Sequence, residues 1–154
     1  MTADAKFNRL SISVHDFEQA IAFSEEAQRS SPGSRSYEAL VFAAIVCYYR
    51  PFSSNEKDKD ASAISKLELD DFSPLTIDEA CVHEKCKELR NQALAHSGYR
   101  HNPTSLNTRS RVISSRPFSL LSHAPNLVTL INLAQKLAKE CHGKRADYVR
   151  DSAS

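Results

Sequence analysis

Residues 37–49 read Tyr37-Glu-Ala-Leu-Val-Phe-Ala-Ala-Ile-Val-Cys-Tyr-Tyr49, a run that is apolar on almost every side of a helix. A helix of this kind belongs at the centre of a bundle, where other helices cover it. It is shorter than the ~20 apolar residues that span a bilayer. Arg50-Pro51 ends the helix, because a residue that precedes proline disfavours the α region. The sequence therefore predicts a central helix from about Arg35 to Tyr49.

The segment before this run predicts a first helix over about 14–28. Val14, Phe17 and Ile21 recur at helical spacing and form an apolar stripe. Ser13 directly precedes the stripe, and serine is among the residue types that cap helix N-termini. We therefore expect the helix to begin just after Ser13.

A third helix is predicted from about Pro74–Thr76 to His96. Thr76 and Glu79 have the spacing of a capping box, in which each side chain accepts a hydrogen bond from the other residue's backbone. Its apolar seam, with positions alternately four and three residues apart, comprises Val82, Cys86, Leu89, Ala93 and His96. His96 therefore occupies a position at which an apolar seam would continue.

The last helix is expected over about 125–142, with Gly143 as its end and residues 143–154 as a polar tail. Four helical segments and no strand alternation of useful length indicate an all-α fold. We expect a single domain over 1–154, built as a four-helix up-and-down bundle with its core in about 10–142.

Two long connections separate the predicted helices, at about 51–73 and 99–122. Loops of roughly 20 residues in a compact domain indicate either a function or an element that periodicity does not show. The second loop carries several basic side chains and no acidic one: Arg100, His101, Arg109, Arg111 and Arg116.

Composition limits the class of protein. Of 154 residues 41% are hydrophobic, which is enough for a core, and three glycines with no tryptophan argue against turn-rich all-β folds. No stretch reaches the ~20 apolar residues of a membrane span. Met1–Arg9 lacks the apolar core of a signal peptide. We therefore expect a cytoplasmic protein with no membrane partner.

The four cysteines are spread through predicted helices, as reduced and buried thiols usually are. Cys81-x-His83-x-x-Cys86 invites a zinc interpretation. Positions five apart in a helix point ~140° away from each other, and no standard zinc spacing matches. Core packing is the better interpretation, so we expect no metal and no cofactor.

Charge is distributed unevenly along the chain. Residues 1–80 carry 8 basic and 14 acidic side chains, a net charge of −6, whereas residues 81–154 carry 12 basic and 5 acidic ones, a net charge of +7. A local positive field attracts polyanions. Acidic and basic helices that pair within one bundle explain the same pattern, so charge alone does not identify a partner.

Residues 88–97 read Glu88-Leu-Arg-Asn-Gln-Ala-Leu-Ala-His-Ser97, which places Arg90 and Asn91 shortly before His96. Arginine binds a phosphate through a rigid fork of donors, and histidine transfers protons near neutral pH. Chemistry on an RNA phosphodiester needs both abilities at one phosphorus atom.

This run resembles the signature of HEPN domains, above all in the branch of bacterial abortive-infection and related defence proteins. In that family an Arg, a polar residue that is often Asn, a short spacer and a His lie near the end of the third helix of a four-helix bundle. Arg90, Asn91 and His96 match it, whereas Gly98 stands where relatives often carry an acidic residue. The motif covers seven residues, and the helical layout extends the resemblance over about 10–142.

The resemblance implies a metal-independent endoribonuclease that works as a homodimer, as a toxin or phage-defence effector. His96 of each subunit would share the acid and base roles, and Arg90 would clamp nonbridging phosphate oxygens. Asn91 would orient the histidine or a phosphate oxygen. One subunit offers a single motif histidine, so a two-fold interface would complete the site. A cognate antitoxin or a defence-system protein is a further possible partner.

Each candidate residue also has a structural interpretation. His96 fits a core histidine that the helix C-terminal dipole stabilises. Arg90 fits a surface cation, and Asn91 fits a polar surface residue. Three residues after the motif either contact RNA or belong to a solvated loop: Tyr99, Arg100 and His101. Three residues at the end of the central helix either flank the site or pack in the core with a helix-end cation: Tyr48, Tyr49 and Arg50.

Two other functions stay open at this stage. One is a non-catalytic HEPN-like module that binds RNA, a nucleotide or a partner protein through the same groove. The other is a helical interaction protein unrelated to HEPN domains. Catalysis requires an exposed His96 near its symmetry mate, whereas a buried His96 favours the interaction protein.

Overall fold

The computed structural model describes residues 3–53, 66–94, 104–107, 112–115 and 120–152. Its α-helices are α1 (Ala3–Arg29), α2 (Arg35–Tyr49), α3 (Ile77–Glu88), α4 (Leu120–His123) and α5 (Leu127–Ser152). The shorter elements are the 3₁₀ helices η1 (Arg50–Phe52) and η2 (Leu69–Asp71), the π-helical segment η3 (Leu89–Leu94), and the strands β1 (Thr104–Asn107) and β2 (Val112–Ser115).

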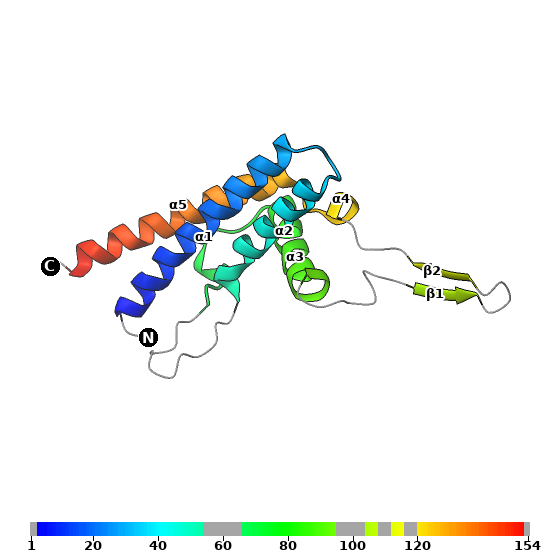
Figure 1. Ribbon diagram of the computed structural model, residues 1–154. Helices are drawn as coiled ribbons and strands as arrows, with labels where there is room; N and C mark the ends of the chain where they lie inside the picture. Colours follow the sequence, from blue (N-terminus) through cyan, green and yellow to red (C-terminus); the bar gives the residue numbers. More distant parts are fainter. Residues whose placement is uncertain (1–2, 54–65, 95–103, 108–111, 116–119, 153–154) are drawn as a thin grey trace.

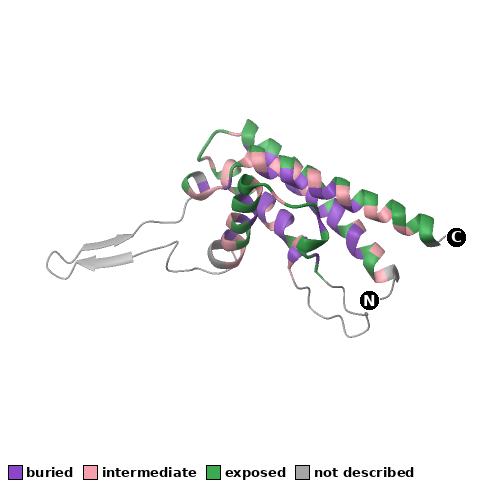
Figure 2. Cartoon of the chain, turned by 180° about the vertical axis from the view of Figure 1, so that it is seen from behind, coloured by how far each residue is buried: buried purple, intermediate pink, exposed green. Residues whose placement is uncertain are grey.

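Two long helices form the axis of the molecule (Figure 1). α1 and α5 lie side by side and run in opposite directions, α2 packs on α1, and α3 contacts both α2 and α5. α3 is seen almost end-on in Figure 1, so it crosses the two long helices. The buried residues lie on the sides of the helices that face one another (Figure 2). The expected all-α helical bundle is confirmed.

α2 has the predicted bounds. Ser34 caps it by accepting a hydrogen bond from the N–H of Tyr37 at 3.1 Å, and Gly33 turns the chain before it with a φ of 75°. Pro51 follows its end, and the chain continues as η1. The buried residues of α2 are Val41, Ala44, Ile45, Cys47, Tyr48 and Tyr49. Neither α2 nor any other helix in the described part of the chain is long and apolar enough to cross a membrane.

The predicted capping box at the start of α3 is confirmed. Thr76 Oγ1 accepts a hydrogen bond from the N–H of Glu79 at 3.2 Å, and Glu79 Oε2 accepts one from the N–H of Thr76 at 2.8 Å. The same Oε2 accepts from Lys136 Nζ at 2.9 Å, which ties α3 to α5. The Thr76 N–H and then the Lys136 ammonium lower the pKa of the Glu79 carboxyl below its usual value.

The predicted start of the first helix near Val14 is wrong, because α1 begins at Ala3. Ser13 is buried within the helix, where its hydroxyl donates to the Arg9 carbonyl at 2.8 Å and caps nothing. Leu10 is also buried, so the apolar stripe continues toward the N-terminus beyond the positions that revealed it in the sequence.

The predicted end of the last helix at Gly143 is also wrong, because α5 continues to Ser152 and includes most of the expected polar tail. Its last turns pack on the start of α1. The rings of Phe7 and Tyr148 have centroids 5.7 Å apart, and the Arg145 guanidinium lies 5.4 Å from the centroid of the Phe7 ring. These contacts offset the cost of a glycine inside a helix.

Replacing Gly143 with alanine should raise the free energy of unfolding by about 0.5–1 kcal/mol, the helix-interior difference between the two residues. A Cβ at this position meets no atom within 4 Å. Urea denaturation followed by circular dichroism measures the change. Gly33→Ala is the matched control, because at a φ of 75° alanine is strained and should lower stability. A loss of stability in Gly143→Ala would contradict a helical backbone there.

The second predicted connection contains elements that the sequence pattern did not reveal. β1 and β2 pair antiparallel, in a register that runs from Thr104 opposite Ser115 to Asn107 opposite Val112. α4 adds one helical turn before α5. The connection over 99–122 therefore contains elements that periodicity does not show, which is one of the two alternatives for a loop of this length.

Candidate functional site

The predicted motif begins where α3 changes into the π-helical segment η3. The N–H of Leu89, the first residue of η3, donates to the carbonyls of both Lys85 and Cys86. Leu89 is fully buried, and η3 packs against α2. π-helical turns are rare and occur frequently at functional sites. The local backbone thus distinguishes this end of α3 from a regular helix end.

Arg90 and Asn91 follow Leu89, and their side chains are hydrogen-bonded to each other. Arg90 Nη1 donates to Asn91 Oδ1 at 2.9 Å, and both residues are half-buried. Consecutive residues on a regular α-helix do not face each other, so η3 brings together two side chains that usually diverge. The bond uses one of the five guanidinium N–H donors. The remaining donors of the pair suit the oxygens of a phosphate.

The other predicted site residues lie outside the described residues: His96, Tyr99, Arg100 and His101. Among the expected catalytic residues, those that the structure describes are Arg90 and Asn91, and it brings these two together. Both are phosphate-binding types, and neither transfers protons near neutral pH.

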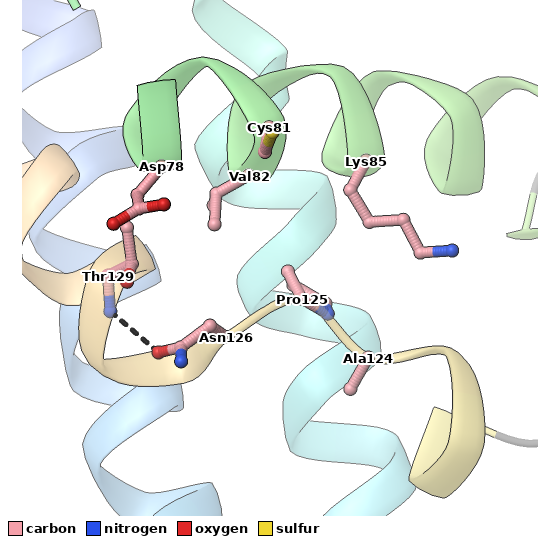
Figure 3. A pocket seen from close by; sticks show the side chains of 8 residues that line it. All are labelled: Asp78, Cys81, Val82, Lys85, Ala124, Pro125, Asn126 and Thr129. Atoms are coloured by element: carbon pink, nitrogen blue, oxygen red, sulfur yellow. Dashed lines mark hydrogen bonds between the residues drawn. The ribbon is translucent and has the colours of Figure 1, made fainter. Parts of the chain in front are cut away.

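A groove lies beside α3, against the segment that leads into α5 (Figure 3). Its volume is about 450 Å³, and its lining comprises Asp78, Cys81, Val82, Lys85, Ala124, Pro125, Asn126 and Thr129. Asn126 Oδ1 accepts a hydrogen bond from the N–H of Thr129 at 3.0 Å, as a helix cap does. Lys85 is the lining residue of α3 nearest to η3 in the sequence. Sequence reasoning missed the groove because the second connection separates its two walls.

The three residues of the rejected zinc interpretation do not converge. Cys81 is exposed on the groove, whereas His83 and Cys86 are buried in the core. Within the described residues no group of three or more His, Cys, Asp or Glu is able to hold a metal ion. Burial raises the pKa of the Cys86 thiol and raises that of Cys141 to about 12, so both stay protonated.

A buried histidine within an aromatic cluster is a feature that the sequence did not reveal. His83 Nδ1 and the Tyr48 hydroxyl are hydrogen-bonded at 2.9 Å, and the imidazole packs at 90° against the Phe52 ring with centroids 4.9 Å apart. Tyr49 also packs on the imidazole. Burial lowers the pKa of His83 and raises that of Tyr48, so both groups are neutral. The interpretation of Tyr48 and Tyr49 as core residues is confirmed.

The free energy of unfolding should fall as the pH drops below about 6.5, the pKa of an unperturbed histidine. Burial is the main cause that lowers the pKa of His83. The Glu84 carboxylate opposes this shift, and the Lys87 cation lowers the pKa further. Between the folded pKa and that of the unfolded chain, the unfolded chain binds more protons, so acidification favours unfolding. Urea denaturation across this window measures the slope. The His83→Asn variant should be less stable, but its stability should depend much less on pH in this window. An unchanged dependence on pH would show that other groups cause it.

Buried ionic groups on α1 hold the junction between α2 and η1. Asp16 is buried, and its Oδ1 accepts a hydrogen bond from Arg50 Nη1 at 2.8 Å. Arg9 lies two turns earlier and is also buried. Its Nη2 donates to the carbonyl of Arg50 at 3.2 Å and to that of Pro51. Burial raises the pKa of Asp16, although the Arg50 and Arg9 cations oppose that rise.

Comparison with known proteins gives no match to a family model, to a curated protein or to a solved structure. Membership of the HEPN family therefore stays a hypothesis. It rests on residues 88–97 and on the layout of the helices.

Proposed function

We propose that this protein is a metal-independent endoribonuclease of the HEPN type that acts as a homodimer, as a toxin or phage-defence effector. The Arg90–Asn91 pair in η3 is the observation that carries the proposal. The two side chains are hydrogen-bonded at 2.9 Å at the end of α3, and His96 follows them in the sequence. The pair supports a role in phosphate binding, and His96 adds the group that transfers protons.

The proposed reaction is attack of the ribose 2′-hydroxyl on the adjacent phosphorus. His96 of one subunit accepts the hydroxyl proton while the 2′ oxygen bonds to phosphorus. The bond from phosphorus to the 5′ oxygen breaks, and His96 of the partner subunit gives that oxygen a proton. The products carry a 2′,3′-cyclic phosphate and a 5′-hydroxyl. The step balances with no water and no metal ion.

Arg90 acts on the nonbridging phosphate oxygens. Negative charge accumulates on these oxygens in the crowded phosphorane, and a guanidinium fork can bind two of them at once. Asn91 Oδ1 holds one guanidinium nitrogen at 2.9 Å, which limits the orientations of Arg90 before RNA binds. Donors that are already oriented need little reorganisation in the transition state.

The excess of positive charge in the half of the sequence that contains the motif supports an RNA substrate. Residues 81–154 carry a net charge of +7, and such a field attracts polyanions. Lys85 lies on α3 before Arg90 and lines the groove of Figure 3. We assign the further RNA contacts to three residues that follow the motif: Tyr99, Arg100 and His101.

A two-fold dimer would supply the second histidine. We place its interface at the C-terminal half of α3 and at η3, which packs against α2. α2 has apolar surface to contribute, because Phe42 is 43% exposed and Ala39 is exposed as well. A two-fold interface uses the same surface of both subunits, so exposed apolar residues of α2 would contact those of the partner. An antitoxin or defence partner would regulate the enzyme by covering the same motif.

The purified protein should cleave single-stranded RNA in EDTA and leave 2′,3′-cyclic phosphate ends. DNA of the same sequence is the matched control, and it should stay intact because it lacks the 2′-hydroxyl nucleophile. Cleavage that requires an added divalent ion would contradict the mechanism. So would a protein that light scattering shows to be monomeric at micromolar concentration, because a monomer has one motif histidine.

RNA binding without cleavage would favour the second candidate, a non-catalytic module that binds RNA, a nucleotide or a partner protein. Arg90 and Asn91 are the specific reason to keep this candidate. They provide phosphate-binding donors without a proton-transfer group.

A further inference from the structure

A second cavity lies where the start of α1, the segment that precedes α3 and the C-terminal part of α5 meet. The two helix ends lie together at the end of the molecule that is away from α3 (Figures 1 and 2). The cavity measures about 410 Å³, and its lining comprises Lys6, Arg9, Leu10, Lys66, Leu67, Asp71, Phe72 and Lys144. This volume lies within the range of small-molecule sites. The cavity shares no lining residue with η3 or with the groove of Figure 3.

Cations dominate the lining, with four basic residues against one acidic residue, Asp71. Asp71 Oδ2 already accepts the N–H of Glu68 at 3.4 Å, and Lys66 Nζ pairs with Glu68 Oε1 at 3.2 Å. Within the part of the chain that the structure describes, neither Lys6 nor Lys144 forms an ion pair with a carboxylate. Among the described residues, no carboxylate therefore competes with an anion for these two ammonium groups.

Arg9 adds a buried positive charge to the wall of the cavity. The residue is 2% exposed, its Nη2 donates to two backbone carbonyls, and its buried Nε has no partner among the described residues. The carbonyl oxygens orient the guanidinium, and the nearby Asp16 carboxylate is shared with Arg50, so the two arginines and one carboxylate keep a net charge of +1. A charge held in surroundings of low dielectric acts more strongly on a nearby anion than a charge in water does.

The floor of the cavity is apolar. Leu10, Leu67 and Phe72 are buried in the core cluster and line the cavity as well. Lys144 Nζ lies 5.7 Å from the centroid of the Phe72 ring, so an ammonium and an aromatic ring border the same space. An anionic group on a ligand would pair with the ammonium while an attached apolar group packs on the ring.

We propose that this cavity binds a small organic anion with an apolar group, such as an aryl phosphate or an aryl carboxylate. Lys6 and Lys144 bind the anionic group, and Phe72 packs against the apolar group. Arg9 strengthens the field from within the wall. This site is independent of the proposed nuclease, because none of its residues belongs to the motif.

Phenyl phosphate is the probe, titrated into the intact protein by isothermal titration calorimetry. It should bind saturably with one site per chain, and benzoate in the same titration separates carboxylates from phosphates as the preferred anion. Inorganic phosphate and phenol should each bind more weakly, because each carries only half of the recognised chemistry. Lys6→Gln and Lys144→Gln should each weaken binding about tenfold, the loss expected for one charge-assisted hydrogen bond.

Lys139→Gln is the matched control, because it removes an exposed charge from α5 outside the cavity and should leave the affinity unchanged. Circular dichroism establishes that each variant is folded, and the two cavity lysines lie on different helices, so they test the site separately. The proposal is overturned if neither aryl anion binds saturably, or if inorganic phosphate binds as tightly as phenyl phosphate. Equal losses in Lys139→Gln and Lys144→Gln would also overturn it, because they would reflect surface charge.

Discussion

Replacing His96 with alanine should lower the rate of RNA cleavage by about 10²–10⁴-fold, the usual contribution of a general acid–base group. Each subunit of the proposed dimer supplies one His96, so the substitution removes the base and the acid together. The rate is the appearance of 2′,3′-cyclic phosphate ends from single-stranded RNA in EDTA. RNA affinity and the circular dichroism spectrum should stay close to those of the natural protein.

Two outcomes would remove His96 from the mechanism. If His96→Ala unfolds the protein, the residue is a core histidine at the end of a helical seam. If the variant cleaves RNA as fast as the natural sequence does, the proton transfers belong to other groups. If the His96→Ala variant is folded, dimeric and inactive, His96 is needed for the chemistry and not for dimerisation.

Arg90 offers a second test of the same site. Arg90→Ala should slow cleavage to a similar degree, because it leaves the charge of the phosphorane unpaired. Arg90→Lys keeps the charge but loses the planar fork, so it should restore only part of the rate. Lys139→Ala is the control for charge alone. Lys139 is an exposed residue of α5 outside the motif, the groove and the proposed interface, and its loss should change the rate little.

Local sequence signals predicted the middle of the fold correctly. The bounds of α2 follow from its apolar run and from Pro51, and the start of α3 follows from the capping box of Thr76 and Glu79. In each case the determining residues are neighbours in the chain. The local sequence was therefore sufficient to predict the bounds of α2 and the start of α3.

The outer ends of the bundle could not be predicted in this way. α1 begins well before Ser13, and α5 continues beyond Gly143, because the two helix ends stabilise each other. The contact of Phe7 with Tyr148 joins residues at opposite ends of the sequence. Periodicity within one segment carries no information about such a contact, so a prediction from that segment places the helix boundaries at the serine and the glycine.

In the candidate site, too, features carried by adjacent residues could be predicted, whereas features that depend on the fold could not. Arg90 and Asn91 were found from the sequence because they are adjacent and their types suit phosphate. The π-helical turn that pairs them gives no signal in a periodic pattern. The hydrogen bond between Tyr48 and His83 joins α2 to α3. The two residues are far apart in the sequence, so no local pattern predicts this contact.

Replacing Asp16 with alanine should lower the free energy of unfolding by about 3 kcal/mol. This is the low end of the cost of breaking a buried ion pair, because the Arg50 side chain is 52% exposed and keeps access to water. The substitution also removes the carboxylate that lies near the buried Arg9 guanidinium. Urea denaturation at neutral pH measures the change.

Two variants distinguish the causes of that loss. Asp16→Asn keeps an oxygen that can accept the hydrogen bond from Arg50 and removes only the charge, and burial already disfavours the charged carboxylate. It should therefore cost clearly less than Asp16→Ala. Glu18→Ala removes an exposed carboxylate of α1, 3.8 Å from His142, and should change stability by less than about 1 kcal/mol. If Asp16→Ala cost no more than Glu18→Ala, the ion pair would not be what holds α1 to the α2–η1 junction.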